Sequence, residues 1–406
     1  IVFTLLLSLP IFLAESVLGR RCGANSRVAI SSLIPGRAGR MLGMLTVITP
    51  LWIVSYYSVV GGWSLDYLFQ ACSFRFVNTP PEALTGSFAQ FTSHAWLPVV
   101  FHLVFLAATV FIVAFGVKAG IEKFSKICIP VLFLLVVLIT VYSLSLPGAS
   151  TGVEYLLKPD FSKVTGHTFL DALGQSFYSL SLGMGIILTY SSYVSKDENL
   201  VVTGFGTSVC DLLFAYLAGF AIMPAVFAAG IEPGSGPGLI FDTLPFIFSE
   251  MGQTMPVVSS IAAILFFLTI LFAALTSSVS LVEVGVAFLT ETKGISRRKA
   301  CVWLFLLCGA LGCLAALSFG PLSGVRLFGG NLFDFADSFA SNVLLVAGGM
   351  LVVILAGWVL PRKEVFAELT NQGTKKANVK LFPLIYFLLR YVAPLGIIAM
   401  IISLAL

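Results

Sequence analysis

The chain has 406 residues, of which 58% are hydrophobic and only 10% are charged. Soluble domains carry about 25% charged residues, so this composition excludes an ordinary soluble protein and indicates an integral membrane protein. The formal net charge of +4 reflects basic residues gathered in alternate loops, and it does not imply a nucleic-acid partner.

Ten segments are long and apolar enough to cross a bilayer, which takes about 20 apolar residues for a helix. Because these segments are rich in Leu, Val and Phe without strict alternation, they favour helices over a membrane β-barrel. The sequence therefore predicts an all-α polytopic membrane protein. The expected spans are 1–19, 41–72, 97–116, 120–146, 170–193, 200–229, 255–290, 299–319, 335–360 and 381–405.

The distribution of Lys and Arg predicts the orientation of these spans. Of the 23 basic residues, 18 fall in alternate loops, and such loops are retained in the cytoplasm. The first span is thus expected to run from outside to inside, and the C-terminus to end outside. The chain begins in apolar sequence without Met and without the features of a signal peptide, so we expect an upstream crossing. The basic loops are 20–40, 117–126, 194–199, 291–299 and 361–380.

The seven cysteines and three histidines show no metal-binding spacing and no arrangement for nucleophilic catalysis. An intramembrane enzyme would need paired carboxylates at depth. The only candidates that we assign are Asp211 and Glu283, which lie on separate spans. We therefore expect that the protein is not an enzyme.

The stretch QSFYSLSLGMG, residues 175–185, places three serines and two glycines inside the span 170–193. A lone Ser or Gly in a span is explained by close helix packing, but this density exceeds what packing requires, and each Gly lowers helix stability by about 1 kcal/mol. Bilayers tolerate a broken helix only where it lines a protein cavity. The stretch predicts a helix interrupted near residues 181–185, of the kind that forms midplane sites in secondary transporters.

Two further spans carry polar groups that suit a small cation. Asp211 is the only ionisable residue well inside the span 200–229, and a carboxylate at that depth is costly unless it meets a cation or water. Thr276 and Ser277 offer adjacent hydroxyls in the span 255–290. Hard oxygen donors favour ions such as sodium, although a protonated Asp and hydroxyls that serve only packing are the alternatives.

Several long motifs of the chain resemble the bacterial branch of the neurotransmitter:sodium symporter family. The resemblance implies a leucine-transporter-like inverted-repeat bundle in one transmembrane domain, with 1–146 as the remainder of the first repeat, 170–360 as the second, and 381–405 as an extra helix. It also implies that span 1–19 corresponds to the family's second transmembrane helix. The motifs are LPIFLAESVLGRRCG, SYYSVVGGW, GIEKFSKICIPVLFLLVVLI, QSFYSLSLGMGIILTYSSY, AGIEPGSGPGLIFDTLP and ALTSSVSLVE.

The resemblance also implies a substrate site. Tyr57 is similar to the tyrosine whose hydroxyl binds the substrate carboxylate, and Tyr178 stands where the family has an aromatic lid. Ile53, Met184 and Leu281 fall at side-chain pocket positions, and their apolar character favours a neutral, hydrophobic or aromatic amino acid. The implied substrate-binding residues are Ile53, Tyr57, Tyr178, Ser179, Ser181, Met184, Ser277 and Leu281.

Two sodium sites follow from the same resemblance. Ser179 and Asp211 match the first site, and Ala273 (through its carbonyl), Thr276 and Ser277 match the second. The family often has Asn where Asp211 stands, with chloride nearby in its animal members. Because Asp211 supplies a fixed negative charge, we predict that chloride is not required.

The implied gates lie on either side of this site. Asp337 matches the acid of the outer gate and Glu291 the acid of the inner gate, and both are expected to pair with upstream arginines. Tyr178 closes the site from outside, and Tyr193 matches a tyrosine beneath the inner gate.

Together these expectations describe a sodium-coupled symporter of neutral amino acids in the bacterial inner membrane. Two alternatives stay open, namely an amino-acid-binding membrane sensor and a proton-coupled transporter of the same fold. The Thr276 and Ser277 pair argues against proton coupling. The sequence does not indicate an oligomeric state.

Overall fold

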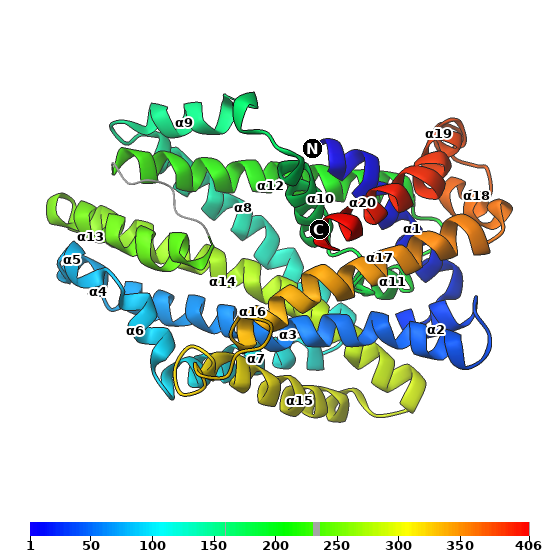
Figure 1. The fold of residues 1–406 in the computed structure, drawn as a ribbon, viewed down its shortest axis with the longest axis horizontal. Coiled ribbons are helices and arrows are strands. Elements are labelled where there is room, and N and C mark those ends of the chain that lie inside the picture. The colour runs from blue at the N-terminus through cyan, green and yellow to red at the C-terminus, as the bar shows by residue number, and fades with distance from the viewer. Residues whose placement is uncertain (159, 230–235, 406) are drawn as a thin grey trace.

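The computed structural model describes residues 1–158, 160–229 and 236–405, and within them the chain is helical, with no β-strand. Residues 230–235, which belong to the motif at 229–245, lie outside the described residues. Most of the long helices run roughly along one direction (Figure 1). This arrangement suits a bundle that crosses a bilayer.

The helices of the first part of the chain include three long ones, α3, α7 and α8. The elements are η1 (Thr4–Ser8), α1 (Leu9–Cys22), α2 (Ser26–Ser31), α3 (Gly36–Cys72), α4 (Arg75–Asn78), α5 (Pro81–Leu84), α6 (Ser87–Ser93), α7 (Leu97–Ala114), η2 (Val117–Glu122), α8 (Lys123–Leu144), α9 (Ala149–Leu157) and η3 (Phe161–Lys163).

The rest of the chain begins with the two short helices α10 and α11, which are separated by a break. The elements are α10 (Gly166–Ser179), α11 (Ile186–Ser191), α12 (Leu200–Ala228), η4 (Leu239–Thr243), α13 (Leu244–Thr254), α14 (Pro256–Ala287), η5 (Phe288–Thr292), α15 (Arg297–Leu317), α16 (Leu332–Phe339), η6 (Ala340–Leu344), α17 (Leu345–Ile354), η7 (Leu355–Val359), α18 (Arg362–Thr370), α19 (Lys376–Phe387), η8 (Leu388–Val392) and α20 (Ala393–Ala405).

Eight helical segments of the described chain are long and apolar enough to cross a membrane. They coincide with eight of the ten predicted spans. The predicted span 1–19 is formed by η1 and α1 in succession, and the predicted span 170–193 is formed by α10 and α11. The helical architecture expected from the sequence is therefore confirmed.

Local sequence explains where several of these helices begin. The side chains of Asn25, Asn199 and Asn331 accept hydrogen bonds from the free backbone amides at the starts of α2, α12 and α16, the usual role of an N-cap residue. Pro256 occupies the first turn of α14, where its missing N–H costs nothing. These residues set the first turns of α2, α12, α14 and α16.

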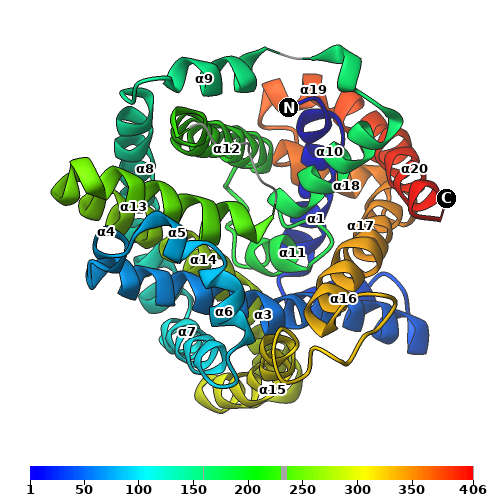
Figure 2. The same cartoon turned by 60° about the vertical axis from the view of Figure 1, so that its left-hand side comes forward.

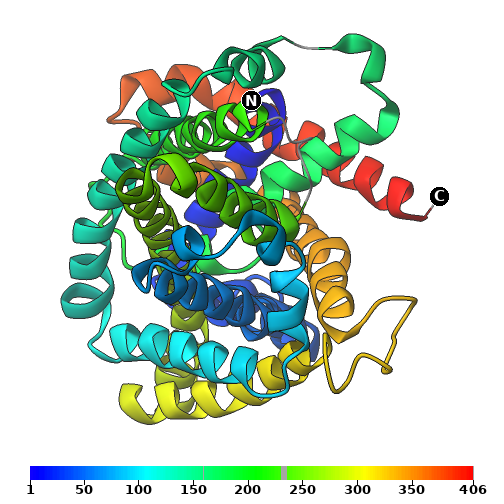
Figure 3. The same cartoon turned by 90° about the vertical axis from the view of Figure 1, so that its left-hand side faces the viewer.

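The short helices identify the two ends of the bundle. Helices α2, α18 and α19 gather at one end and α4, α5 and α13 at the other (Figure 1), and Figure 3 looks at the bundle from the second end. The first end carries the basic loops 20–40 and 361–380. By the positive-inside rule it is the cytoplasmic end.

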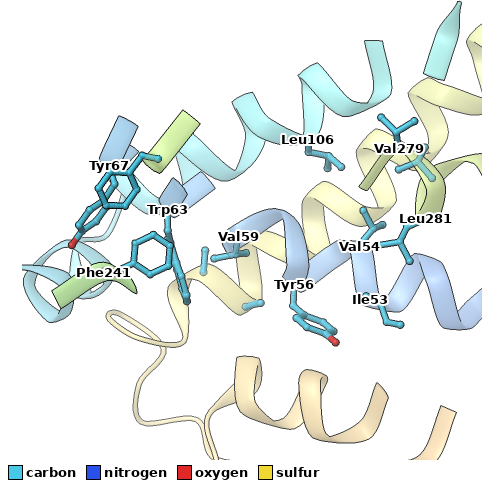
Figure 4. Packing of buried hydrophobic residues seen from close by; sticks show 14 of the residues in the cluster. Ile53, Val54, Tyr56, Val59, Trp63, Tyr67, Leu106, Phe241, Val279 and Leu281 are labelled. Atoms are coloured by element: carbon cyan, nitrogen blue, oxygen red, sulfur yellow. The ribbon is translucent and has the colours of Figure 1, made fainter. Parts of the chain in front are cut away.

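Aromatic side chains pack η4 against α3. Trp63 and Tyr67 of α3 are buried, and their ring centroids lie 5.8 and 5.0 Å from that of Phe241 in η4. Farther along the same helix, Ile53 and Val54 approach Leu281 of α14 (Figure 4). The core thus holds α3 and α14 side by side, and the site described next adjoins them.

Candidate substrate and sodium site

The predicted interruption of the span 170–193 is confirmed. Helix α10 ends at Ser179 and α11 begins at Ile186. Between them Ser181, Gly183 and Gly185 have φ angles of 55, 76 and 70°. This is the left-handed region that glycine adopts readily and other residues rarely, so the two glycines explain why the helix breaks here.

The broken segment is tightly enclosed by its neighbours, and Figure 2 shows α1 and α11 near the centre of the bundle. A Cβ atom on Gly183 would lie 2.3 Å from the carbonyl oxygen of Leu345 in α17. A Cβ atom on Gly185 would lie 2.5 Å from the carbonyl oxygen of Thr46 in α3. Close backbone approach is thus a second requirement for glycine at both positions.

Glu15 of α1 is the hydrogen-bond partner of a backbone amide at the break. Its carboxylate accepts a hydrogen bond from the Gly183 amide at 2.7 Å, and its side chain is fully buried. Glu15 is not among the site residues predicted from the sequence. An acidic residue within a predicted span is a functional candidate by default, and that signal was available.

The residues named from the sequence largely surround one cavity of about 450 Å³, a volume typical of small-molecule sites. The break, α3, α12 and α14 all contribute to its walls. The predicted residues that line it are Ile53, Tyr57, Tyr178, Ser179, Ser181, Met184, Asp211, Thr276, Ser277 and Leu281. The lining residues that we did not name are Phe12, Ser125, Ile129, Leu180, Ile186, Ile187, Tyr190, Thr207 and Ser280.

Oxygen atoms concentrate at two places on the cavity wall. The Ser179 hydroxyl lies 2.7 Å from both carboxylate oxygens of Asp211, so the last turn of α10 meets the middle of α12. On α14, Thr276 donates to the carbonyls of Phe272 and Ala273 at 3.1 and 2.9 Å. These hydroxyls retain lone pairs with which they can coordinate a cation.

Apolar side chains form the rest of the wall. Ile53, Met184 and Leu281 are buried, and the rings of Tyr57 and Tyr178 border the same space. Tyr190 donates a hydrogen bond to Ser280 at 3.2 Å and thereby ties α11 to α14. The cavity combines an apolar wall with a few hydroxyls and one carboxylate, a combination that suits a small ligand with a polar end.

Four of the predicted residues are not among those that line the cavity. Ala273 lies one turn before the Ser277 position on α14, and its carbonyl accepts from Thr276. Glu291 accepts hydrogen bonds from the backbone and side-chain nitrogens of Asn25, at 2.7 and 3.0 Å. Asp337 lies on α16, near the buried hydroxyl of Tyr56.

Tyr193 joins a second cluster near the cytoplasmic end of the bundle. Its hydroxyl donates to Glu283 at 3.2 Å, and Glu283 forms an ion pair with Arg297. Arg297 also donates to the carbonyl of Val113 at 2.8 Å. The cluster connects the segment after α11 with α14, α15 and α7.

Our assignment of acidic residues in the spans was incomplete. Besides Asp211 and Glu283, the spans hold two further buried acids, Glu15 and Asp66, which are 0% and 5% exposed. Asp66 accepts from Gln70 at 2.5 Å within α3. Both acids therefore have polar partners, and within the described residues no group of three His, Cys, Asp or Glu side chains forms a metal site.

A helical membrane bundle with a cavity at a broken helix is the architecture of a secondary transporter. The model of the sodium:neurotransmitter symporter family matches residues 84–406, and the chain belongs to this family. It is accordingly a sodium-coupled transporter of the leucine-transporter fold and not an enzyme.

Similar proteins cover the whole chain. The sodium-dependent transporter YhdH of Bacillus subtilis is 36% identical over 100% of this chain and 88% of its own length. A sodium-dependent transporter of Haemophilus influenzae is 34% identical over 98% of this chain and 88% of its own length. The crystal structure of MhsT in complex with L-phenylalanine matches with a TM-score of 0.89 and 37% identity, over 99% of this chain and 90% of that chain.

Proposed function

We propose that the protein imports neutral amino acids, hydrophobic or aromatic, together with sodium across the bacterial inner membrane by alternating access. The observation that carries this proposal is the composition of the cavity wall. Among the described lining residues, Asp211 is the only charged one, and Ile53, Met184 and Leu281 form an apolar patch. A zwitterion with an apolar side chain fits such a wall better than a substrate with a charged side chain.

The substrate is oriented by groups on α3 and beside the break. The Tyr57 hydroxyl binds the carboxylate, and Tyr178 covers the substrate from the outer side. Met184 adapts to side chains of differing shape because its thioether chain is flexible. The neighbouring structure of MhsT holds L-phenylalanine, which supports an aromatic substrate for this chain.

Two sodium ions accompany the substrate in this proposal. Ser179 and Asp211 bind the first ion, and the Ala273 carbonyl, Thr276 and Ser277 bind the second. Freed backbone carbonyls at the break complete the shell with hard oxygen donors. Glu291, Asp337, Tyr178 and Tyr193 act as gate residues on the two sides of the site.

Uptake into proteoliposomes tests the proposal. The full gene product is reconstituted, and labelled phenylalanine, leucine, aspartate and lysine are offered under an inward sodium gradient. We expect accumulation of phenylalanine or leucine only with sodium. Binding without accumulation would favour an amino-acid sensor, and accumulation driven by a proton gradient in sodium-free buffer would favour the proton-coupled alternative.

Chloride independence is a separate part of the proposal. Asp211 provides a fixed negative charge beside the first sodium ion, where relatives with a neutral residue need an anion. Uptake in gluconate is expected to equal uptake in chloride, and Asp211→Asn is expected to lose activity or to become chloride-stimulated. A collapse of wild-type uptake in gluconate would contradict this role of Asp211.

A further inference from the structure

Arg390, on the last membrane-spanning segment, lies among aromatic side chains at the seam between η7 and η8. Its guanidinium carbon is 4.5 Å from the ring centroid of Trp358, 5.9 Å from that of Tyr386 and 5.8 Å from that of Tyr391. The Trp358 indole donates to the Arg390 carbonyl at 3.1 Å. The seam therefore fixes the position of the cation.

Among the described residues, no acidic side chain forms an ion pair with this guanidinium. Within the described residues its side chain makes one hydrogen bond, to the Tyr386 hydroxyl at 3.3 Å, while its buried Nε makes none. A guanidinium carries five N–H donors, and unsatisfied donors are costly where lipid replaces water. We therefore expect the remaining N–H groups of Arg390 to donate to an acceptor that is not part of the chain.

A second cation lies beside the same ring. The guanidinium carbon of Arg362, the first residue of α18, is 5.3 Å from the centroid of Tyr386. The nearby acids of α18 are engaged elsewhere, since Glu364 pairs with Arg21 and Glu368 with Arg20 and Lys196. Positive charge at this seam is consequently not neutralised by α18.

Trp358 places the seam near the cytoplasmic end of the bundle, because the candidate span that contains Trp358 ends at Val359. Trp358 stands next to the end of η7, just before the cytoplasmic helix α18. Trp358 and Tyr391 are 55% and 45% exposed on the outside of the bundle. Exposed Trp and Tyr beside Arg are typical of the headgroup level of a bilayer.

We propose that this seam binds the headgroup of an anionic phospholipid of the inner leaflet. Arg390 donates to the phosphate, Arg362 adds positive charge from the cytoplasmic side, and Trp358 and Tyr391 flank the glycerol region. The positive charge of the two arginines favours an anionic headgroup as the occupant. Basic pockets between membrane helices on the cytoplasmic side bind such headgroups, whereas a zwitterionic lipid would offset the phosphate with its own cation.

Native mass spectrometry of the full gene product tests the proposal with phosphatidylglycerol, phosphatidylcholine and inorganic phosphate as probes. One cation near a membrane surface contributes enough to change affinity about fivefold, so Arg390→Gln is expected to weaken phosphatidylglycerol binding about fivefold. Arg362→Gln is expected to act in the same direction. The matched control is Arg298→Gln, which removes an exposed cytoplasmic charge from α15, and its binding is expected to equal wild type.

Three results would contradict the proposed lipid site. The first is equal affinity of the wild-type protein for phosphatidylglycerol and phosphatidylcholine, and the second is an equal loss of affinity in the Arg298→Gln control. The third is full displacement of phosphatidylglycerol by millimolar inorganic phosphate. Wild-type protein gives a measurement that does not depend on a variant folding. A photoactivatable phosphatidylglycerol is expected to label residues 355–362 or 384–391, and labelling confined to other segments, or protein–protein crosslinks at this seam in place of lipid, would refute the proposal.

Discussion

The broken segment α10–α11 and the continuous helix α14 both contribute hydroxyls to the cavity, but they satisfy their own polar groups in opposite ways. In α14, Thr276, Ser278 and Ser280 each donate to a backbone carbonyl three or four residues earlier. In the broken segment, Ser179 donates to Asp211, and the Gly183 amide donates to Glu15.

A continuous helix and a broken helix therefore contribute to the cavity in different ways. Helix α14 keeps its backbone bonds, and in our proposal it offers the side-chain oxygens of Thr276 and Ser277 together with the Ala273 carbonyl. The broken segment leaves backbone groups without partners inside a helix, and it therefore depends on partners from α1 and α12 and on close packing against α17. We expect substitutions at the break to affect the fold and transport together, and substitutions on α14 to affect chiefly the ion.

The largest effect is expected for Gly183→Ala. Alanine in the left-handed region costs about 1–2 kcal/mol, and its Cβ would meet the Leu345 carbonyl at 2.3 Å. We expect a loss of measurable uptake and a lower melting temperature. The control is Gly206→Ala, a helical position with no atom within 4 Å of the added Cβ, where melting temperature is expected to stay the same or rise.

The double substitution of Thr276 and Ser277 by Ala tests the contribution of α14. Two side-chain oxygens disappear while the helix remains, because its backbone bonds are unchanged. Each lost interaction is worth about 1 kcal/mol or more, so the sodium concentration for half-maximal uptake is expected to rise at least about tenfold. Ser278→Ala is the control, since the one partner of that buried hydroxyl among the described residues is the Ala274 carbonyl. Unchanged sodium affinity in the double variant would contradict the place of α14 in the ion site.

Glu15→Ala removes the acceptor of the hydrogen bond from the Gly183 amide at the break. Removing one partner of a buried hydrogen bond leaves the other unsatisfied, which costs about 1–3 kcal/mol, so we expect a loss of about 2 kcal/mol in stability and weaker substrate binding. Glu15→Gln retains one carbonyl oxygen for the Gly183 amide and is expected to retain most of both. Thermal unfolding and equilibrium substrate binding measure the two effects, and equal values for the Ala and Gln variants would contradict the role assigned to this hydrogen bond.

The sequence predicted the break, and the polar groups of Asp211, Thr276 and Ser277, for physical reasons. A dense group of Ser and Gly within an apolar span has few explanations in a bilayer, and a carboxylate at residue 211 needs a partner there. The family motifs then located Tyr57 and Leu281, which periodicity alone does not distinguish from packing residues. Helix ends were predictable where Pro or Asn marks them, as at Pro256 and Asn199.

The sequence was less informative where a partner is distant along the chain. The bond between Glu15 and Gly183 joins residues 168 positions apart, and no local pattern predicts it. The same holds for Phe12 and Ser125, which line the cavity from α1 and α8. Arg390 was visible as a basic residue within a span, but its aromatic surroundings come from η7 as well as η8.

The smallest predicted effect concerns the hydrogen bond that joins the two regions directly, from Tyr190 of α11 to Ser280 of α14 at 3.2 Å. A neutral hydrogen bond contributes about 1 kcal/mol, so Tyr190→Phe is expected to lower stability by about that amount. Ser280→Ala is expected to cost a similar amount, because it removes the same bond together with a weak bond to the Thr276 carbonyl. If the bond couples α11 to α14, the double variant costs little more than the Ser280 variant alone, and the double-mutant cycle yields a coupling energy of about 1 kcal/mol. Additive losses in thermal unfolding would instead mean that the two regions are held together by packing around the cavity and not by this bond.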